Sequence, residues 1–412
     1  MRQKSCYRIF SGHIIRQHRI GESSLIDVLL ARNNPWWESD YTAEGLIRRE
    51  SVISTLRPLL SPRQALFLTG LRRVGKTSLM KLLIADHIAN GTADPRDILY
   101  VSLDDYQLEK KSVHEIVEEF RRIHRHPFDR PLLLFFDEIT YRDRIEVELK
   151  SLFDSQPVAI CASSSSAPVL RDKKALLTGR GRIVEILPLD FAEYCLFRGI
   201  VIKTRDKHLT DAYFEEHLRD GGIPEFVRSG DPEYLRNLVD DIIYKDIAAM
   251  HGIRNIQQLK EMFLLLMERA GKQVSINKVA TILGIAPDTA KRYLDLFTRT
   301  YLVHVIPRHG KTNEQLLAPK KIYAGDIGVR CYATGLRDKG SLFENYVYLK
   351  LRPQKPRYVY EEGVELDFVT ERGELIEVKY NAEMNEKQKR LFANFRATKK
   401  RVITSVADAL SL

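Results

Sequence analysis

The chain has 412 residues, which is more than one ordinary hydrophobic core accommodates, so we expect several domains. Its composition, 44% hydrophobic and 29% charged, is that of a globular protein and excludes a largely disordered chain. No apolar run approaches the 18 or so residues of a membrane helix, and the polar, basic N-terminus lacks the apolar stretch of a secretory signal. We therefore expect a cytoplasmic protein with no membrane partner.

The net charge of +10 is concentrated in the last third of the chain. From Ser275 to the C-terminus there are 24 Lys and Arg residues against 16 Asp and Glu residues, a net charge of +8. A basic domain attracts polyanions, of which nucleic acid is the commonest, although a basic surface can also serve solubility alone. The four cysteines form no C-x-x-C pair and the histidines no H-E-x-x-H motif, so the sequence does not support a zinc enzyme.

The first strong motif is QALFLTGLRRVGKTSLMKLLI, which predicts a buried strand, a tight loop and a helix. The loop has the pattern G-x-x-x-x-G-K-T in the strand and helix context that a phosphate-binding P-loop requires. Its glycines let backbone N–H groups point at phosphates, Lys76 would reach the β and γ phosphates, and the Thr77 hydroxyl would bind Mg²⁺. The predicted nucleotide-binding residues of the loop are Gly70, Leu71, Arg72, Arg73, Val74, Gly75, Lys76, Thr77 and Ser78. The predicted cofactors are ATP and Mg²⁺.

A second buried strand, in RPLLLFFDEIT, ends in Asp137 and Glu138. Because α/β sheets bind ligands at the carboxyl ends of their strands, both acids are predicted to lie beside the P-loop. Asp137 would hold Mg²⁺ through water and Glu138 would polarise the water that attacks ATP. The alternative is an ordinary strand end with acidic turn residues.

The next strand, in PVAICASSSSAPVL, ends in serines, of which Ser163 or Ser164 is a candidate sensor of the γ-phosphate. A serine-rich turn is the alternative. In the following LLTGRGRIVEILPLDFAEY, Arg180 and Arg182 come after a glycine turn. Arg180 could neutralise transition-state charge, within one subunit or across the interface of a homo-oligomer, while structural pairing of both arginines is the alternative.

Residues 201–267 have helical periodicity and are predicted to form a lid on the ATPase core. The GGIPEF stretch inside it predicts a turn, and we assign no chemistry to Gly222 or Glu225. From Ser275 the pattern changes to helix, tight turn, helix and β-rich segment, which is typical of a winged helix-turn-helix.

The second helix of that unit carries Lys291, Arg292 and Arg299, where contacts to a DNA groove or to phosphates would be made. Nucleic acid, DNA in particular, is therefore the predicted partner. A winged helix that packs only against protein is the alternative, and would imply a protein partner.

The C-terminal stretch predicts an amphipathic helix, SLFENYVYLKL, with Glu344 beside its apolar edge, followed by three strands. Strand alternation places Glu377 and Lys379 on one face, with Asp367 on the adjoining strand. Carboxylate oxygens suit Mg²⁺ or Mn²⁺, so Glu344, Asp367 and Glu377 are predicted metal ligands. Asp367, Glu377 and Lys379 are predicted catalytic residues for phosphodiester cleavage, with a solvated hairpin face as the alternative.

Several motifs in one order, GLRRVGKTS, LLLFFDEI, ASSSS, LTGRGRIVEILPLDFAEY, GGIPEFV and IIYKDI, resemble a widespread archaeal and bacterial family of AAA-type P-loop ATPases. The resemblance runs from about Gly45 to the C-terminus. This family usually has glycine where Ala162 precedes the sensor serines.

The acid followed by Glu377-x-Lys379 resembles the restriction-endonuclease-like, or PD-(D/E)XK, superfamily, whose domain is commonly fused to these ATPases. This resemblance implies Asp367, Glu377 and Lys379 as catalytic positions, Glu344 as the helix acid and Gln388 as a substrate contact. Such fused domains either keep the nuclease activity or retain only the fold.

The predicted fold class is α/β, with a parallel P-loop sheet of AAA type. The predicted divisions are an N-terminal segment (1–44), the ATPase domain (45–200), the lid (201–267), the winged helix-turn-helix (268–318) and the restriction-endonuclease-like domain (319–412). The sequence leaves the role of the N-terminal segment, with Trp36 and Trp37, open, and packing on the ATPase sheet is the simplest expectation for it. The predicted function is ATP binding and hydrolysis that control a metal-dependent nuclease acting on DNA. The alternative is a nucleotide-dependent switch whose nuclease-like domain is catalytically silent. A transporter-like or chaperone-like ATPase is disfavoured by the basic C-terminus and the lack of membrane segments.

Overall fold

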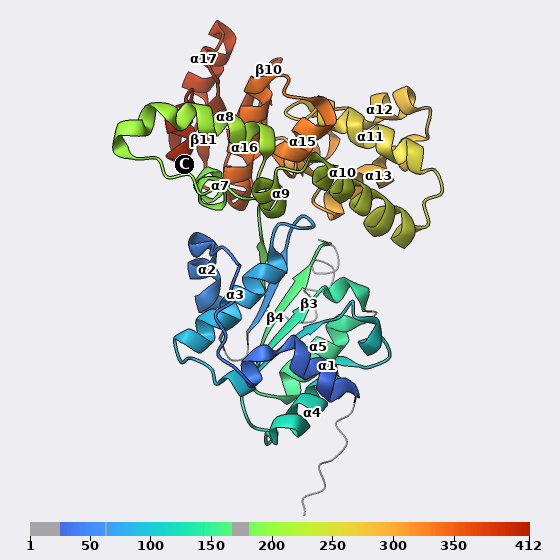
Figure 1. Cartoon of the computed structure of the whole chain (residues 1–412). Coiled ribbons are helices and arrows are strands. Elements are labelled where there is room, and N and C mark those ends of the chain that lie inside the picture. The colour runs from blue at the N-terminus through green and yellow to red at the C-terminus, as the bar shows by residue number, and fades with distance from the viewer. Residues whose placement is uncertain (1–24, 62–63, 143, 167–180) are drawn as a thin grey trace, which may run out of the picture.

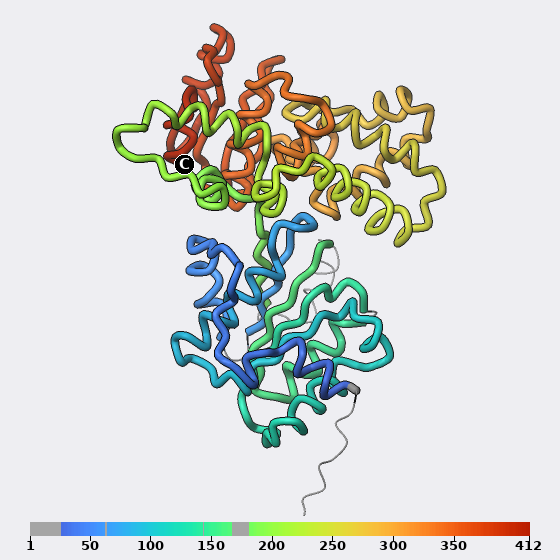
Figure 2. The backbone as a smooth tube through the Cα atoms, viewed as in Figure 1, coloured from blue at the N-terminus to red at the C-terminus, as the bar shows by residue number. Residues whose placement is uncertain are grey.

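The computed structural model describes residues 25–61, 64–142, 144–166 and 181–412. Figure 1 shows two parts, an N-terminal part built around a parallel sheet and a C-terminal part that lies across the top of it. The chain passes from one part to the other after the last strand of the parallel sheet, as the tube in Figure 2 shows. None of the helices in these ranges combines the length and the hydrophobicity needed to cross a bilayer.

The N-terminal part contains a five-stranded sheet in which every strand is parallel to its neighbours. Its strands are β1 (Ala65–Thr69), β2 (Ile98–Ser102), β3 (Leu132–Asp137), β4 (Val158–Ser164) and β5 (Gly181–Glu185), in the order β2-β3-β4-β1-β5. The helices α2 (Glu50–Leu56), α3 (Lys76–Ala89), α4 (Val113–His124) and α5 (Ile145–Ser155) belong to this part. Strands β1 to β4 are almost wholly buried, which explains their continuous apolar runs. The predicted α/β P-loop sheet is confirmed.

The residues before α2 cover the edge strand β2. Helix α1 (Leu25–Asn33) leads into the turn Pro35–Trp37, and both tryptophan Nε1 groups donate to the carbonyl of Ile98, at 3.1 and 2.8 Å. An exposed edge strand leaves backbone groups unpaired, so this cover satisfies part of the edge. Trp36 and Trp37 thus pack on the sheet, as expected from the sequence.

A helical region follows β5. It comprises α7 (Phe191–Arg198), α8 (Thr210–Asp220), α9 (Pro224–Ser229), α10 (Pro232–Asp241), a π-helical segment (Ile242–Ala249) and α11 (Ile256–Glu268). Gly221, at φ +75°, and Gly222 form the predicted turn before α9. A Cβ at Gly222 would collide with the Leu189 carbonyl, so only glycine lets the turn approach the segment after β5.

A second sheet follows α11. It contains β6 (Gln273–Val274), β7 (Val303–Ile306) and β8 (Lys320–Ala324) in the order β6-β8-β7, all antiparallel. Between β6 and β7 lie α12 (Ile276–Leu283) and α13 (Pro287–Arg299), and α14 (Thr312–Leu317) lies between β7 and β8. Gly284 ends α12 in the left-handed conformation and Pro287 begins α13, as helix-end preferences predict.

Residues 327–412 form a mixed sheet flanked by helices. The elements are α15 (Ile327–Thr334), α16 (Lys339–Leu351), β9 (Arg357–Glu361), β10 (Val364–Val369), β11 (Glu374–Val378), α17 (Glu386–Asn394), β12 (Lys399–Ile403) and α18 (Val406–Leu410). The strand order is β12-β11-β10-β9, with β12 parallel to β11 and the other pairs antiparallel. All three strands predicted from YVYEEG, VELDFV and ELIEVKY are present.

Helix α16 corrects the expectation of an amphipathic helix with one apolar face. Its buried residues include not only Leu342, Phe343 and Val347 but also Asn345 and Tyr348, which lie on other faces. The reason is that α16 packs against α8, β8 and β11 at once. A helix that is covered on nearly all sides belongs to the core.

Candidate functional site

The loop between β1 and α3 has the backbone conformation that phosphate binding requires. Gly70 and Gly75 have φ values of +136° and +96°, a region that residues with side chains rarely adopt. A Cβ at Gly70 would also collide with the carbonyl of Ile186. The loop leads directly into α3, whose first N–H groups lack helical partners and so favour an anion.

Lys76 lies inside this loop, with only 5% of its surface exposed. Its ammonium donates to the carbonyls of Gly70 at 3.0 Å and Leu71 at 3.2 Å, so the side chain closes the loop on itself. Burial lowers the pKa of Lys76. A phosphate bound in the loop would give this ammonium a negatively charged partner in place of two neutral carbonyls, and charge-assisted hydrogen bonds are the stronger kind.

The Asp137 carboxylate at the end of β3 accepts hydrogen bonds from three hydroxyl groups. Thr77 Oγ1 donates to its Oδ2 at 2.6 Å and the Tyr100 hydroxyl donates to the same oxygen at 2.9 Å, while Ser163 Oγ donates to Oδ1. The structure thus brings together three predicted residues from the loop and two strand ends. A hydroxyl and a carboxylate oxygen are ligands that Mg²⁺ accepts, so Thr77 and Asp137 fit a magnesium ion.

Glu138 adopts a left-handed conformation, at φ +51°, which is uncommon for a residue with a side chain. Its backbone N–H donates to Ser163 Oγ at 3.0 Å, and its carboxylate accepts from Ser165 Oγ at 3.1 Å. Burial raises the pKa of Glu138. Such strained positions recur at active sites, where the surrounding contacts hold them.

A cavity of about 410 Å³ opens over the loop and reaches Glu138. Sequence reasoning missed part of its lining, namely Leu46, Ile47, Pro224, Arg228 and Tyr234, and assigned no role to Glu225. These residues come from the segment before α2 and from α9 and α10. No local pattern marks them, because they meet the P-loop only when the helical region packs over it.

The two arginines of the P-loop are ion-paired with that helical region. Arg72 lies 2.8 Å from Asp246 in the π-helical segment, and Arg73 lies 3.1 Å from Asp241 at the end of α10. The Arg73 guanidinium also lies over the ring of Tyr234, 4.8 Å from its centroid. π-helical turns are rare and occur frequently at functional sites. The loop that would hold phosphate is therefore physically connected to the region after β5.

The structure gives less support to a functional role for the other predicted arginines and lysines. Arg180 lies outside the described residues, and Arg182 is exposed on the edge strand β5. On α13, Lys291 and Arg299 pair with acids of the same helix, at 3.3 and 2.6 Å, and Arg292 donates to the carbonyl of His251 at 2.8 Å. Much of the positive charge predicted for this helix is thus balanced locally.

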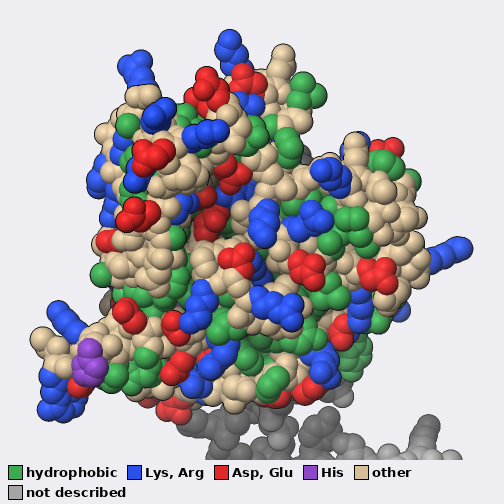
Figure 3. Space-filling model, turned by 90° about the horizontal axis from the view of Figure 1, so that it is seen from above, with side chains coloured by type: hydrophobic (Ala, Val, Ile, Leu, Met, Phe, Trp, Pro, Cys, Tyr) green, Lys and Arg blue, Asp and Glu red, His purple; other side chains and the backbone are tan. Residues whose placement is uncertain are grey.

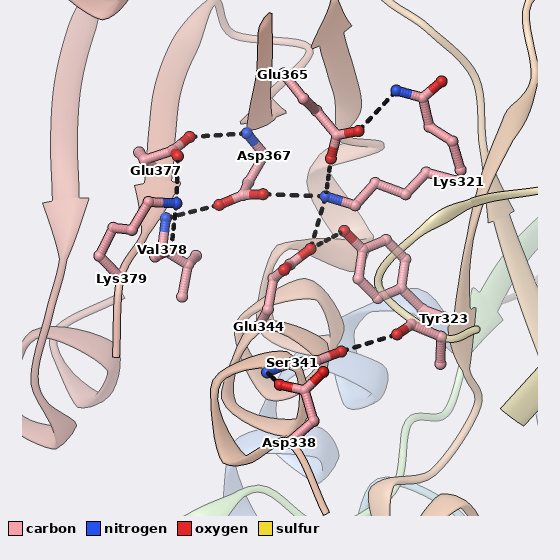
Figure 4. Close-up of polar contacts among 12 residues, drawn as sticks. Lys321, Tyr323, Asp338, Ser341, Glu344, Glu365, Asp367, Glu377, Val378 and Lys379 are labelled. Carbon is pink, nitrogen blue, oxygen red and sulfur yellow. Dashed lines mark hydrogen bonds and ion pairs between the residues drawn. The ribbon is translucent and has the colours of Figure 1, made fainter. Parts of the chain in front are cut away.

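A second polar site lies between β10 and β11 in the C-terminal part (Figure 4). The Asp367 N–H donates to Glu377 Oε2 at 2.9 Å, the Val378 N–H donates to Asp367 Oδ2 at 2.9 Å, and Lys379 Nζ lies 2.6 Å from Glu377 Oε1. Gln388 of α17 donates to Glu377 Oε1 at 3.3 Å. Asp367, Glu377, Lys379 and Gln388 are therefore brought together.

Lys321 of β8 lies in the same site and was not singled out from the sequence. Its ammonium lies 2.7 Å from Glu344, 2.6 Å from Glu365 and 3.0 Å from Asp367, and the residue is 1% exposed. Glu344 also accepts a hydrogen bond of 2.6 Å from the Tyr323 hydroxyl.

The predicted metal-ligand set of Glu344, Asp367 and Glu377 is not assembled as expected. Within the described ranges, no group of three or more His, Cys, Asp or Glu residues is arranged to hold a metal ion. The physical reason is that the ammonium of Lys321 lies against Glu344 and Asp367, while Glu377 is turned toward Lys379. These residues do not fit a divalent cation in this arrangement.

The ionisable groups of this site shift one another's pKa values. Burial, with the nearby Asp367, raises the pKa values of Glu344 and Glu377 above the ordinary range of glutamate. Burial lowers the pKa of Lys321, but the surrounding carboxylates and Tyr323 raise it by more, so its net shift is upward. The carboxylates around Lys321 thus favour its charged form.

The sequence contained a signal for one of the two overlooked charges. Glu365 stands two residues before Asp367 on one strand, so the two acids share a face. Lys321 had no such signal, because it follows another lysine in APKKIYAGD and its burial depends on a distant helix.

Two segments of this chain match models of known protein families. Residues 62–195 match the family model described as an AAA domain, and residues 211–340 match a model described as a domain of unknown function. An uncharacterized protein of Methanocaldococcus jannaschii is 28% identical over 361 residues, which is 82% of this chain and 80% of the relative. An uncharacterized protein of Haemophilus influenzae is 24% identical over 326 residues, covering 75% of this chain and 79% of the relative.

A solved structure of the replication initiator DnaA bound to AMPPCP and single-stranded DNA is 16% identical and covers 63% of this chain and 93% of its own. Its TM-score of 0.29 is too low for the likeness to bear on fold or function. The family match is more informative, because it spans the P-loop, Asp137, Glu138 and the serines of β4. With the parallel sheet and the loop geometry, this match identifies residues 62–195 as an AAA-type P-loop nucleotide-binding domain.

Proposed function

We propose that this protein is an ATP-hydrolysing switch whose nucleotide state controls a nucleic-acid-binding C-terminal part. One observation carries the proposal: the P-loop that holds Lys76 is ion-paired, through Arg72 and Arg73, with the helical region that follows β5. A change in the nucleotide phosphates would therefore act directly on the helical region outside the ATPase sheet.

The residues around the loop have separate roles in this proposal. Lys76 would turn from its own loop carbonyls to the β and γ phosphates. Thr77 and Asp137 would hold the magnesium ion, which when bound neutralises phosphate charge. Glu138 would orient and polarise the attacking water, and its raised pKa makes it a better proton acceptor. Ser163, bonded to Asp137 and Glu138, would report the presence of the γ-phosphate.

Phosphate release by the full chain tests this function. We expect hydrolysis of ATP with Mg²⁺ present, its loss in excess EDTA and its recovery when Mg²⁺ is restored, because the charge on the triphosphate must be neutralised. Added duplex DNA is expected to change the rate. A chain that neither binds nor hydrolyses ATP with Mg²⁺ would refute the proposal.

Coupling to the helical region gives a second expected result. Phosphates and Asp246 compete for Arg72, so replacing Asp246 by asparagine should free the loop and tighten ATP binding, by roughly threefold to tenfold. The nucleotide-dependent change in hydrogen exchange over residues 232–249 should shrink at the same time. The measurements are titration with a fluorescent ATP analogue and hydrogen exchange with and without nucleotide.

Asp240→Asn is the matched control. Asp240 lies in α10, just before the π-helical segment that carries Asp246, but its carboxylate pairs with Lys260, at 2.6 Å, rather than with the loop. It should leave ATP affinity unchanged. If Asp246→Asn also binds ATP with wild-type affinity and shows wild-type exchange, the ion pairs do not couple the two regions.

We further propose that α12, α13 and the β7–β8 hairpin form a winged helix-turn-helix, and that α16, β9 to β12 and α17 form a restriction-endonuclease-like domain. The order of elements and the strand order of each sheet support both assignments. The net charge of +8 after Ser275 supports nucleic acid as the partner. Figure 3 views the C-terminal part from above and shows Lys and Arg side chains spread over the surface, with Asp and Glu side chains between them. We therefore expect nucleic acid to be contacted at separate points rather than along one basic stripe.

Metal-dependent phosphodiester cleavage by the C-terminal part is the second candidate function. It is favoured by the close approach of Asp367, Glu377 and Lys379 on two paired strands, with Gln388 beside them. The ammonium of Lys321 in the same site weighs against it. The nucleotide-dependent switch with a silent nuclease-like domain is therefore the better supported of the two functions.

A further inference from the structure

We propose that Lys321 is a built-in cation of the acidic site, placed where the carboxylates of Glu344 and Asp367 would otherwise share a divalent metal ion. The ammonium and a metal ion would then exclude each other. In this protein the lysine occupies the position, and its removal should turn the site into a divalent-cation site. This inference is independent of ATP hydrolysis.

The first argument is that the Lys321 ammonium has as many carboxylate partners as it has hydrogens. An ammonium has three hydrogens to donate, and Lys321 Nζ lies within 2.6 to 3.0 Å of three carboxylates, those of Glu344, Glu365 and Asp367. These acids come from α16 and β10 and converge on this one nitrogen, as Figure 4 shows. Each hydrogen therefore has a charged acceptor.

The second argument is that the ammonium is held in place. Lys321 lies on β8, the middle strand of its sheet, and the ring of Tyr323 on the same strand stacks on Tyr348 of α16, with centroids 4.2 Å apart. The backbone N–H and carbonyl of Ala324 are both hydrogen-bonded to Asn345, at 2.9 and 3.1 Å. Strand and helix are thus tied together directly after the lysine.

The same sheet also supplies neutral donors to the acids. Tyr323 donates to Glu344, and Gln273 of β6 donates to Glu365 at 2.7 Å. With Lys321, three side chains from one sheet satisfy carboxylates of the neighbouring domain. The sheet therefore acts as a cap on the acidic site rather than as a loosely attached neighbour.

The third argument is electrostatic. Magnesium binds carboxylate oxygens at about 2.1 Å. An ion bound to the oxygens that now face Lys321 would lie in contact with the ammonium, so two cations would repel each other in a buried place. Conversely, removal of the lysine would leave Glu344, Glu365 and Asp367 without the ammonium that lies among them, and neighbouring acids with less compensating charge favour uptake of a cation.

Manganese binding by the full chain without nucleotide tests the proposal, with Mn²⁺ followed by electron paramagnetic resonance and by calorimetry. We expect no Mn²⁺ site that depends on Asp367 in the wild type. Lys321→Met, which keeps an apolar stem of similar length, should gain one such site, bound at least roughly tenfold more tightly than any site of the wild type. Adding Asp367→Asn to Lys321→Met should remove the gained site, which separates it from binding at the P-loop.

Lys320→Met is the matched control, because Lys320 precedes Lys321 on the strand but its ammonium faces the carbonyl of Gln315. It should gain no Mn²⁺ site. An Asp367-dependent site in the wild type, or a folded Lys321→Met protein without one, would overturn the proposal.

Stability provides a second readout in case Lys321→Met folds poorly. Mn²⁺ should raise the melting temperature of Lys321→Met and leave that of the wild type unchanged, because only a ligand that binds the folded state stabilises it. The double variant Lys321→Met/Glu365→Gln carries one acid fewer and should fold more readily while keeping Glu344 and Asp367. If neither variant is stabilised by Mn²⁺, the proposal fails.

Discussion

Replacing Lys76 by alanine is expected to lower the rate of ATP hydrolysis at least about a hundredfold, which is the usual cost of removing one charged group that stabilises the transition state. The reason is that Lys76 is the one ammonium that the P-loop itself encloses, hydrogen-bonded to the carbonyls of Gly70 and Leu71. Arg72 and Arg73 are paired with acids outside the loop, and neither is enclosed by it as Lys76 is. The measurement is phosphate release at saturating ATP and Mg²⁺.

Lys81→Ala provides the control for this substitution. Lys81 lies on the same helix, and its ammonium lies over the ring of Tyr100 at 5.9 Å from the centroid, outside the phosphate loop. Its hydrolysis rate should stay close to that of the wild type. Wild-type hydrolysis by Lys76→Ala would mean that the ATP site lies elsewhere in the chain.

The second large effect is expected on stability, from Arg49. This arginine is 5% exposed and forms a two-pronged ion pair with Glu193 of α7, at 2.9 and 2.8 Å. It also donates to the carbonyls of Val74 in the P-loop and Leu187 after β5, at 3.3 and 3.1 Å. Arg49→Met would leave the Glu193 carboxylate buried and unpaired, which costs about 3–5 kcal/mol. Guanidinium unfolding, followed by tryptophan fluorescence, measures the loss.

The neighbouring Arg48 offers the comparison. Arg48 is largely solvent-accessible, and its partner Asp86 keeps a second ion pair with Arg57, so Arg48→Met should cost less than about 1 kcal/mol. Adding Glu193→Gln to Arg49→Met should recover part of the lost stability, because no buried charge is then left alone. Equal losses of unfolding free energy in Arg48→Met and Arg49→Met would show that the buried ion pair stabilises the protein no more than the exposed one.

The nucleotide site was largely predictable from the sequence because its chemistry is local. Gly70, Gly75, Lys76 and Thr77 stand in one loop, and Asp137 ends a strand whose apolar run predicts its place in the sheet. Parallel strands align their carboxyl ends, so the meeting of Thr77 and Asp137 follows from the fold class. The lining from α9 and α10 was not predictable, since it depends on how the helical region folds back over the loop.

The acidic site was only half predictable, for a different reason. Strand alternation by itself put Glu377 beside Lys379, and the short hairpin brought Asp367 opposite them. Glu344 is predicted as a further metal ligand from its place beside the apolar edge of the helix, because an acid near other acids suggests a cation. The cation proved to be Lys321, an ammonium supplied by a separate sheet.

The sequence by itself determined the order of strands and helices, the P-loop and the pairing of Asp367, Glu377 and Lys379, because these depend on neighbours within a few residues or on one hairpin. Only the tertiary structure decided that α16 is buried on nearly all sides, that Arg72 and Arg73 pair with the helical region, and that Lys321 lies among three carboxylates. Such contacts join residues far apart in the chain, and the burial of Lys321 makes its attraction to the carboxylates stronger than that of an ion pair in water. Local patterns specify the elements, whereas the charges that meet between elements are specified by packing.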